Sequence, residues 1–325
     1  MKHKEFINAI KKKEDEVVKL LLLEGADEML KAEDEKGNNF FHIIADQYKP
    51  NMELLKLALE SVNIKKINEK KKRVESKDIS PNTELESLVF DSPIEEIINK
   101  KNNQGETPLT IALKAYGVDE VAIELIKNSA NLEELDNEGN NFFHLIANKS
   151  NVNQELIAVA RNDSIKRMIN EKNSNGETPL IIALKNCREL QSLELIKNGA
   201  EPKEVGVDKK TGNNIFHLIA NINYPHEELI KSAFKIPTEG MIDAKNNKGE
   251  TPLKIALEKG NEKLALQLIN NGAELKEVGV DEKTGNNIFH LIANIYEPDA
   301  KLIESAFQIP TEGMIDAKNN KGETP

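Results

Sequence analysis

Four histidines of this chain stand at the same place in a repeated phrase, where they could act as metal ligands or as an acid–base array. Successive members lie at least one whole repeat apart in the sequence. If the repeats stack as packed helices, about 10 Å separates neighbouring layers, whereas a metal ion needs its ligands within about 2 Å. We therefore interpret each histidine as structural and expect no metal site. The four are His42, His144, His217 and His290.

The single cysteine offers no better case for catalysis. Cys187 lies in a turn-like stretch before Arg188, and no histidine and asparagine are spaced around it as a cysteine nucleophile would require. The chain contains no phosphate-binding loop, no H-E-x-x-H pair and no nucleophile elbow. We therefore expect a chain that is not an enzyme and has no catalytic residue and no cofactor.

Composition and charge exclude several other classes. The 325 residues carry a net charge of -11, so the basic footprint that nucleic-acid binding needs is missing. One cysteine permits no intrachain disulfide. No apolar run reaches the ~20 residues of a membrane span, and Met1–Glu5 lacks the apolar segment of a secretory signal. We expect a cytoplasmic protein that binds neither nucleic acid nor membrane.

Two phrases alternate along the chain and define its elements. One, Gly-Asn-Asn-(Phe/Ile)-Phe-His, marks the His-class repeats and begins at Gly37, Gly139, Gly212 and Gly285. The other, Gly-Glu-Thr-Pro, marks the Thr-Pro-class repeats and begins at Gly105, Gly176, Gly249 and Gly322. Residues 205–252 and 278–325 agree at 40 of 48 positions, and no aliphatic position changes while charges reverse. This pattern indicates a buried face beside a solvated one.

Within one repeat the pattern predicts two short helices. In 249–273, Thr251 can cap a helix that has Pro252 at its first position. The apolar residues that follow form this helix and, after a turn at Gly260, a second one. Gly272 suits the left-handed end of the second helix, and the polar stretch after it would form a hairpin loop. The same stop is expected at Gly25, Ser129 and Gly199.

These features resemble the ankyrin repeat. The phrase Gly-Glu-Thr-Pro-Leu-x-Ile-Ala-Leu, a period of about 33 residues and a second helix ending in Gly-Ala are similar to that family's motif. The resemblance implies an all-α, ankyrin-type solenoid of stacked helix-turn-helix repeats with hairpin loops. It also implies that the motif's histidine ties its helix to the hairpin by hydrogen bonds. The chain departs from the family in the Thr-Pro class, where Thr110, Ile181 and Lys254 replace this histidine.

The predicted domain organisation follows the phrases. Residues 1–36 form an N-terminal capping repeat, and 37–104 form a repeat with a charged loop insertion near 62–90. Residues 105–321 form six repeats in two alternating classes, and 322–325 begin a truncated repeat.

Two irregularities leave alternatives open. The insertion contains the basic tetrad Lys70–Arg73, which is either a nuclear import signal or part of a solvated loop. Because the chain stops inside a motif, we expect a fragment of a longer protein. The alternative is a natural end closed by self-association of this edge. Without such association the chain is expected to be monomeric.

The resemblance implies that a partner binds the hairpin tips and the ends of the first helices. These positions are Asn103, Gln104, Lys114, Asn137, Glu138, Ser174, Asn175, Lys185, Lys210, Thr211, Asn247, Lys248, Glu258 and Lys259. The four tyrosines all fall in a turn between two helices: Tyr48, Tyr116, Tyr224 and Tyr296. They could form an aromatic edge for a partner, or they could cover the turn and pack on the neighbouring repeat. We favour packing.

The function expected from these features is a protein-protein interaction module, an adaptor or scaffold that binds another protein. The Lys-, Asn-, Ile- and Glu-rich composition is similar to that of ankyrin proteins that intracellular bacteria deliver into host cells. An effector in the host-cell cytosol is therefore a further hypothesis. The alternative is a targeting arm of a larger enzyme whose catalytic domain lies beyond residue 325, and a self-assembling structural array is a third possibility.

Overall fold

The structure is a computed structural model that describes residues 2–61, 93–309 and 313–325. In this part of the chain every regular element is a helix and no strand is present, so the predicted all-α fold is confirmed to that extent. None of the described helices combines the length and the apolar character that crossing a bilayer requires. The charged insertion near 62–90 and the tetrad Lys70–Arg73 lie outside the described residues.

Two compact units divide the chain, and each is described on its own. Unit 1 comprises Met1–Met168 and Asn173–Asn175, and unit 2 comprises Ile169–Lys172 and Gly176–Pro325. The helices of unit 1 are α1 (Lys2–Lys12), α2 (Asp15–Leu30), α3 (Phe40–Ala45), α5 (Pro93–Ile98), α6 (Pro108–Lys114), α7 (Asp119–Lys127), α8 (Phe142–Asn148), α9 (Gln154–Val159) and α10 (Asp163–Lys166). Residues 52–61 are also helical, and a 3-10 turn, η2 (Arg167–Asn170), follows α10.

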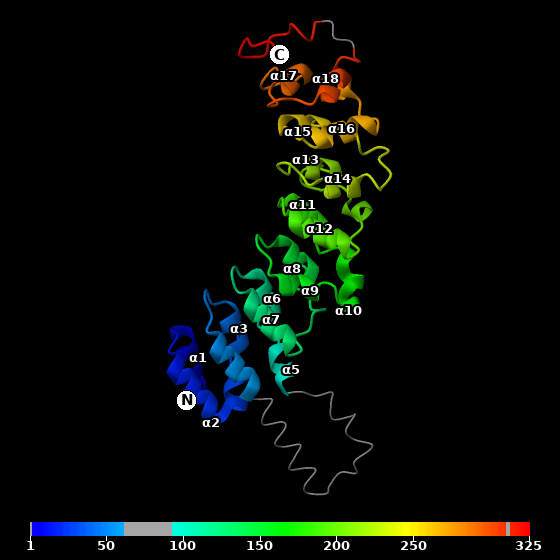
Figure 1. Cartoon of the computed structure of the whole chain (residues 1–325). Coiled ribbons are helices and arrows are strands. Elements are labelled where there is room, and N and C mark those ends of the chain that lie inside the picture. The colour runs from blue at the N-terminus through cyan, green and yellow to red at the C-terminus, as the bar shows by residue number, and fades with distance from the viewer. Residues whose placement is uncertain (1, 62–92, 310–312) are drawn as a thin grey trace. The chain divides into compact units, whose positions relative to one another are not determined.

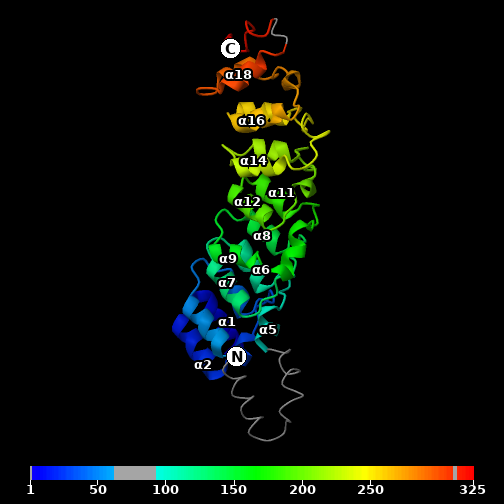
Figure 2. The same cartoon turned by 45° about the vertical axis from the view of Figure 1, so that its right-hand side comes forward.

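The first helices of successive repeats pack against each other in unit 1. Contacts run from α1 to α3, from α3 to α6 and from α6 to α8, while α7 packs beside α9 (Figures 1 and 2). All six residues of α3 are buried, as expected for a helix that is apolar on nearly every side. The rings of Phe6 and Phe40 stack with centroids 6.0 Å apart and join the first two layers.

Unit 2 has two helical layers that run side by side (Figure 1). One layer contains α11 (Pro179–Lys185), α13 (Ile215–Ala220), α15 (Pro252–Glu258) and α17 (Ile288–Ala293). The other contains α12 (Glu189–Lys197), α14 (Glu227–Ala233), α16 (Glu262–Asn270) and α18 (Ala300–Ala306). Short 3-10 turns, η3 (Pro202–Val205) and η4 (Leu275–Val278), follow α12 and α16. Each helix contacts the next member of its own layer, so apolar side chains are buried between layers of repeats.

Helix starts and most helix ends follow the sequence pattern. The Thr251 side chain accepts a hydrogen bond from the backbone of Lys254, and Pro252 stands at the first helical position. Gly199 and Gly272 have φ values of 104° and 97° just after α12 and α16, as the predicted helix ends require. Ser129 adopts the same left-handed conformation, at φ 71°, after α7.

The interruption predicted at Gly25 is confirmed, although the left-handed conformation expected there is not adopted. Gly25 has φ −175° and ψ 68°, which are not helical values, so α2 consists of two helical segments and the second one runs on to Leu30. Met29 and Leu30 are 4% and 0% exposed. Burial of these two side chains favours a second helical segment after the glycine.

Candidate protein-interaction surface

Each His-class phrase builds a buried polar contact that we call the Asn–His clamp. In α13 the side-chain oxygen of Asn214 accepts hydrogen bonds from the backbone of Phe216 and His217. His217 Nδ1 accepts the backbone N–H of Asn214 at 3.2 Å. This reciprocal pair satisfies N–H groups at the start of a fully buried helix. The same pair forms at Asn39–His42, Asn141–His144 and Asn287–His290.

The clamp also holds the hairpin of the following repeat. Asn214 Nδ2 donates to the Met241 carbonyl at 2.7 Å, and His217 Nε2 lies 3.0 Å from the Glu250 carbonyl. Because a carbonyl only accepts, Nε2 carries the proton and Nδ1 accepts. Met241 and Glu250 flank the hairpin, so one Asn–His pair holds both of its ends. The structural role predicted for the histidines is confirmed by this contact and by the matching contacts His42–Glu106 and His290–Glu323.

Burial of the clamp opposes a charged imidazole. His42 and His217 are 1% and 0% exposed. Burial lowers the pKa of both below the usual 6.5, although the carbonyl partners partly oppose the shift. His42 and His217 are therefore neutral at neutral pH. Among the described residues, no group of three His, Cys, Asp or Glu side chains could hold a metal ion.

Thr-Pro-class repeats hold the next hairpin through a different contact, the Lys–Asp bridge. Lys185 at the end of α11 lies 2.6 Å from Asp208 of the following hairpin and 2.5 Å from Glu177 of its own repeat. Asp208 is buried and also accepts hydrogen bonds from the N–H and hydroxyl of Thr211. Equivalent bridges are Lys11–Asp34, from the first repeat, Lys114–Asp136 and Lys254–Asp281.

These bridges favour the charged form of both partners. Burial alone would raise the pKa of Asp34, but Lys11 and the N–H groups of its own hairpin bring it down to about 2. Burial would likewise lower the pKa of Lys185, but its hydrogen bonds to Asp208 and Glu177 raise it above 10.5. A hairpin that begins with a buried carboxylate therefore depends on the lysine of the preceding repeat.

The lysine can reach its aspartate from two helix positions. In α11 it is the last residue, Lys185, whereas in α15 the last residue is Glu258 and the lysine stands one turn earlier, at Lys254. Residues four apart share one face of a helix. Lys254 therefore still reaches Asp281, at 2.8 Å. This lysine occupies the position that the ankyrin motif gives to histidine.

Successive hairpins also contact each other at their tips. Asn247 donates its backbone N–H to the Thr211 carbonyl and its side-chain amide to the Lys210 carbonyl, both at 2.9 Å. Gly212 has φ +72°, and a Cβ there would lie 2.6 Å from Asn247 Oδ1, so glycine is required for two reasons. The same backbone contact joins Asn103 to Lys36 and Asn320 to Thr284.

The residues predicted to bind a partner occupy two kinds of position. The tip residues are exposed: Asn103, Gln104, Asn137, Glu138, Ser174, Asn175, Lys210, Thr211, Asn247 and Lys248. Glu258 and Lys259 are exposed at the end of α15. Lys114 and Lys185 are engaged in Lys–Asp bridges, so a partner would compete there with an intramolecular contact. The binding role of all these residues stays a prediction.

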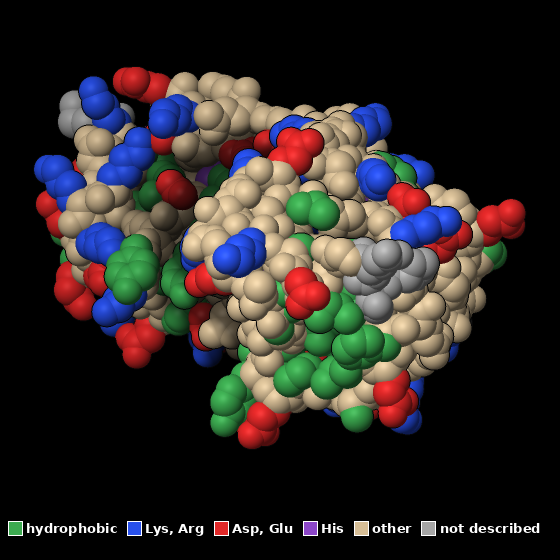
Figure 3. Space-filling model, turned by 90° about the horizontal axis from the view of Figure 1, so that it is seen from above, with side chains coloured by type: hydrophobic (Ala, Val, Ile, Leu, Met, Phe, Trp, Pro, Cys, Tyr) green, Lys and Arg blue, Asp and Glu red, His purple; other side chains and the backbone are tan. Residues whose placement is uncertain are grey.

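In unit 1 the tips and first helices border an open groove of about 570 Å³. Its lining includes Lys11 of α1, His42 of α3, Gln104 of a hairpin tip and Lys114 of α6. The groove therefore brings together the two kinds of position, tip and helix end, that the sequence assigns to a binding face. On the face of the molecule in Figure 3, basic and acidic side chains are interspersed.

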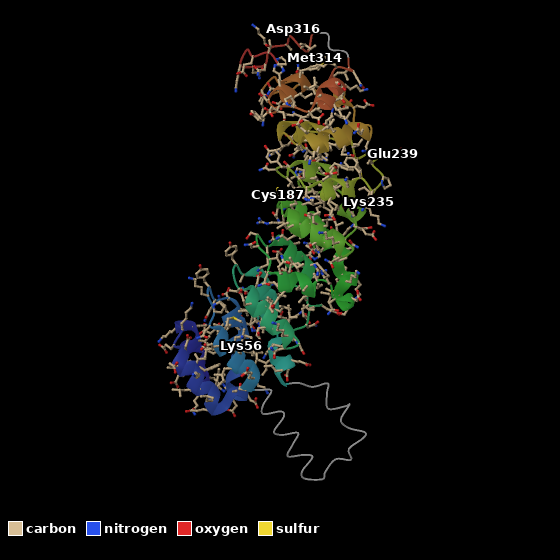
Figure 4. All side chains as sticks on the ribbon, in the orientation of Figure 1. Lys56, Cys187, Lys235, Glu239, Met314 and Asp316 are labelled. Atoms are coloured by element: carbon tan, nitrogen blue, oxygen red, sulfur yellow. The ribbon has the colours of Figure 1, made fainter. Side chains whose placement is uncertain are left out.

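The tyrosines of the inter-helix turns lie in solvent. Tyr48, Tyr116, Tyr224 and Tyr296 are 69%, 74%, 80% and 87% exposed, so the interpretation that they pack on a neighbouring repeat is wrong. At Tyr224 the backbone N–H donates to Asn261 Oδ1 at 3.0 Å, so the main chain holds this turn and the ring stays outside. An aromatic edge for a partner stays a prediction. Cys187 occupies the corresponding turn after α11 and is also exposed (Figure 4).

Sequence reasoning missed the Lys–Asp bridges. The signal that could have revealed them is the first residue of each hairpin. It is aspartate before a His-class phrase, at Asp34, Asp136, Asp208 and Asp281. It is asparagine before a Thr-Pro phrase, at Asn102, Asn173, Asn246 and Asn319. A carboxylate that recurs only before one class indicates a cation supplied by the other class.

Comparisons with known proteins give distant similarities. No known protein-family profile matches the chain. Over 192 residues, 58% of its length, the chain is 28% identical to the nuclear factor NF-kappa-B p105 subunit of Gallus gallus, of which the match covers 19%. Over 111 residues, 34% of its length, it is 30% identical to phosphocholine transferase AnkX of Legionella pneumophila, of which the match covers 11%. The match therefore spans less than a fifth of either relative.

Among solved structures, the chain is similar to one in the complex of the predatory endopeptidase Bd0816 from Bdellovibrio bacteriovorus with the immunity protein Bd3460. The sequence identity is 22%, the TM-score is 0.43, and the match covers 82% of this chain and 96% of the other. A likeness at this level supports no inference about function.

Proposed function

We propose that the chain is built of ankyrin-type repeats and acts as a protein-protein interaction module, an adaptor or scaffold. Three observations support this proposal. Each unit contains stacked pairs of short helices, the helix starts carry the expected caps, and glycine hairpins join the repeats. The similarity to p105 and AnkX, both of which contain ankyrin repeats, agrees with the assignment.

The exposed hairpin tips are the observation that carries the proposal. The Asn–His clamps and Lys–Asp bridges fix each hairpin to the repeat before it. Contacts such as Asn247–Thr211 then hold neighbouring tips together. A partner would therefore meet a row of polar groups that is already ordered, which lowers the entropy cost of binding. The groove of unit 1 would add the helix ends to this surface.

Site-specific photo-crosslinking of the full chain tests this surface. A photoreactive amino acid at Gln104, on a tip, should give discrete protein adducts in a cell extract, and the yield should depend on salt if charges contribute. The same group at Lys56, which is exposed on the 52–61 helix (Figure 4), serves as the control. Equal adducts from both positions, or none from Gln104, would argue against the hairpin face as the binding surface.

A second candidate is a targeting arm within a larger enzyme. The similarity to AnkX favours it, because the printed name of that protein is that of a transferase and the match covers only 11% of it. In this case the chain would recognise the substrate protein and a further domain would perform the chemistry. Sequencing of the full gene discriminates the two candidates, since a continuation made only of further repeats would remove the enzyme.

We also propose a cytoplasmic location, and the host-cell cytosol if the protein is a bacterial effector. The Legionella relative gives this hypothesis its support. A reporter fused to the full-length protein should then register in the host cytosol during infection, and a signal confined to the bacteria would contradict the effector hypothesis.

A further inference from the structure

The hairpin tips of unit 2 carry a concentration of lysines on a chain whose net charge is -11. We call this set the lysine ridge. Its members stand one or two to a tip in four successive hairpins, and all are exposed: Lys209, Lys210, Lys248, Lys283 and Lys321. The only carboxylate among the tip residues of unit 2 is Glu282. The ridge is therefore locally basic despite the acidity of the whole chain.

Hydrogen bonds between hairpins bring members of the ridge together in pairs. Asn247 donates to the carbonyls of Lys210 and Thr211, so the tip with Lys248 lies against the tip with Lys210. Asn320 makes the same two contacts with Lys283 and Thr284, and this places Lys321 beside Lys283. The ridge is thus organised by the backbone of the hairpins and not by the lysine side chains.

The ridge lysines have no ion-pair partner among the described residues. Two lysines elsewhere in unit 2 do have such a partner, since Lys185 and Lys254 neutralise the hairpin carboxylates Asp208 and Asp281. These two bridges matter to the ridge, because they neutralise the carboxylates that begin two of its four hairpins, whereas Glu250 and Glu323 stand two residues after Lys248 and Lys321 and form no ion pair among the described residues. The charge of Lys248 acts electrostatically on the Glu258 carboxylate, but the two side chains form no ion pair. The ammonium groups of the ridge are therefore available to an external anion.

Unit 1 shows that basic tips are not a general feature of the repeat. Its tip residues are Glu35, Lys36, Asn103, Gln104, Asn137, Glu138, Ser174 and Asn175. These tip residues include one lysine and two glutamates, although the hairpins are built in the same way as those of unit 2. The lysines of unit 2 are consequently not needed to form a hairpin.

We propose that the lysine ridge binds an acidic, extended segment of a partner protein. This inference rests on the proposed function, since it names the chemistry of the partner that the tips would recognise. A peptide is favoured over a nucleic acid because carboxylates interrupt the ridge, with Glu282 within it and Glu250 and Glu258 nearby on the same repeats. A continuous polyanion would meet these carboxylates, whereas a peptide can place its own carboxylates opposite the lysines only.

The test uses the full chain and a labelled peptide in which glutamate alternates with glycine and serine. A control peptide has glutamine in place of every glutamate. Fluorescence anisotropy compares the wild type with a ridge variant, in which K209Q, K210Q, K248Q, K283Q and K321Q are combined. The control variant removes the same number of exposed lysines that lack a side-chain partner elsewhere, through K4Q, K19Q, K56Q, K235Q and K301Q. Lys56 and Lys235 of the control set are labelled in Figure 4.

The wild type should bind the glutamate peptide and not the glutamine peptide, and added salt should weaken binding. The ridge variant should bind about tenfold more weakly, whereas the control variant should change by less than about twofold. Equal weakening by both variants would overturn the proposal, because net charge and not the ridge would then explain binding. Tighter, ridge-dependent binding of a single-stranded DNA oligonucleotide of equal charge would also overturn it.

The same variants separate this inference from the proposed function. If the ridge variant keeps the crosslinked adducts of the tip at Gln104 but loses the peptide, both proposals stand. If the adducts form and the peptide never binds, only the ridge inference fails. If the peptide binds while no protein adduct forms at any tip, the proposed function as a protein-protein interaction module fails, and the ridge binds anions without serving a protein partner.

Discussion

The two classes of repeat hold the next hairpin with opposite chemistry. A His-class repeat uses a buried, neutral pair, in which Asn214 and His217 donate to carbonyls at 2.7 and 3.0 Å. A Thr-Pro-class repeat uses charge, since Lys185 lies 2.6 Å from Asp208. The hairpin that is held differs accordingly in its first residue. This residue is asparagine after a His-class repeat and aspartate after a Thr-Pro-class repeat.

This difference in chemistry indicates how a repeat of one class is kept next to a repeat of the other class. Apolar positions recur in the repeats of both classes, so apolar faces alone would not distinguish a neighbour of the correct class from one of the wrong class. A His-class repeat placed before an aspartate hairpin would leave that carboxylate buried without its lysine, which is strongly unfavourable. The alternation therefore opposes stacking against a repeat of the wrong class, while the aliphatic core supplies the stability.

The largest expected effect comes from removing the buried imidazole. H217A deletes two hydrogen bonds and leaves a cavity beside the Glu250 carbonyl, so the free energy of unfolding should fall by about 3 kcal/mol. Urea unfolding of the full chain measures it. A cap deletion in the other class, T251A, removes only a helix cap and should cost about 1 kcal/mol. Equal losses would contradict the distinction between the classes.

Two hairpin glycines, Gly212 and Gly249, should respond differently to an added side chain. Gly212 has φ +72° and is covered by Asn247, whereas Gly249 has φ +76° and nothing within 4 Å of an added Cβ. G212A should therefore destabilise the chain by about 2–3 kcal/mol, and G249A by about 1 kcal/mol from backbone strain alone. The difference between the two urea midpoints checks the tip contact, and a reversed order would exclude it.

A charge reversal and its rescue sharpen the account of the Lys–Asp bridge. K185E places a carboxylate beside Asp208 and should cost about 2 kcal/mol. The double variant I181K/K185E copies the arrangement of Lys254 and Glu258, so it should recover at least half of that loss. Thermal and urea unfolding of the three proteins measure the recovery. A double variant less stable than K185E would show that the lysine cannot reach from the earlier turn.

The smallest expected effect is a class-specific dependence on pH. The folded pKa of His42 and His217 lies below 6.5, so their contribution is complete above about pH 6.5 and is lost as the pH falls toward the folded values. The free energy of unfolding should therefore fall between pH 7 and pH 5. H217A should show a shallower loss than wild type in this window, measured as the urea midpoint at each pH.

The aspartates should respond in a separate window. Asp34 has a folded pKa of about 2 against the usual 3.8, so the stability that it contributes is present above 3.8 and is lost as the pH falls toward 2. D34N should therefore flatten the pH dependence below about pH 4 and leave the window between pH 5 and 7 unchanged. A D34N effect confined to the upper window would contradict the assignment of charge to this class.

Much of the local structure was predictable from the sequence, because caps, glycines and apolar spacing act over a few residues. The asparagine and threonine caps, the buried histidines and the ends of α12 and α16 all follow from such signals. The second helical segment of α2, which follows the break at Gly25, was not predictable, since it depends on the burial of Met29 and Leu30.

The candidate surface was predictable in position but not in detail. The tips follow from the motif, yet the engagement of Lys114 with Asp136 requires knowing which hairpin lies beside α6. The exposure of the tyrosines depends on turns such as that of Tyr224, where the backbone bonds to Asn261 of the following repeat. Contacts between repeats are invisible to periodicity, because the pattern within a repeat is the same whichever neighbour it has.

The most direct test of the clamp is the protonation state of His217, read by long-range ¹H–¹⁵N NMR of the full chain near pH 7. The account predicts a neutral ring with the proton on Nε2. This proton should exchange slowly with water, because Nε2 donates it to the Glu250 carbonyl. A proton on Nδ1, or a ring protonated at both nitrogens through the 2.9 Å approach of Asn214 Oδ1, would contradict it.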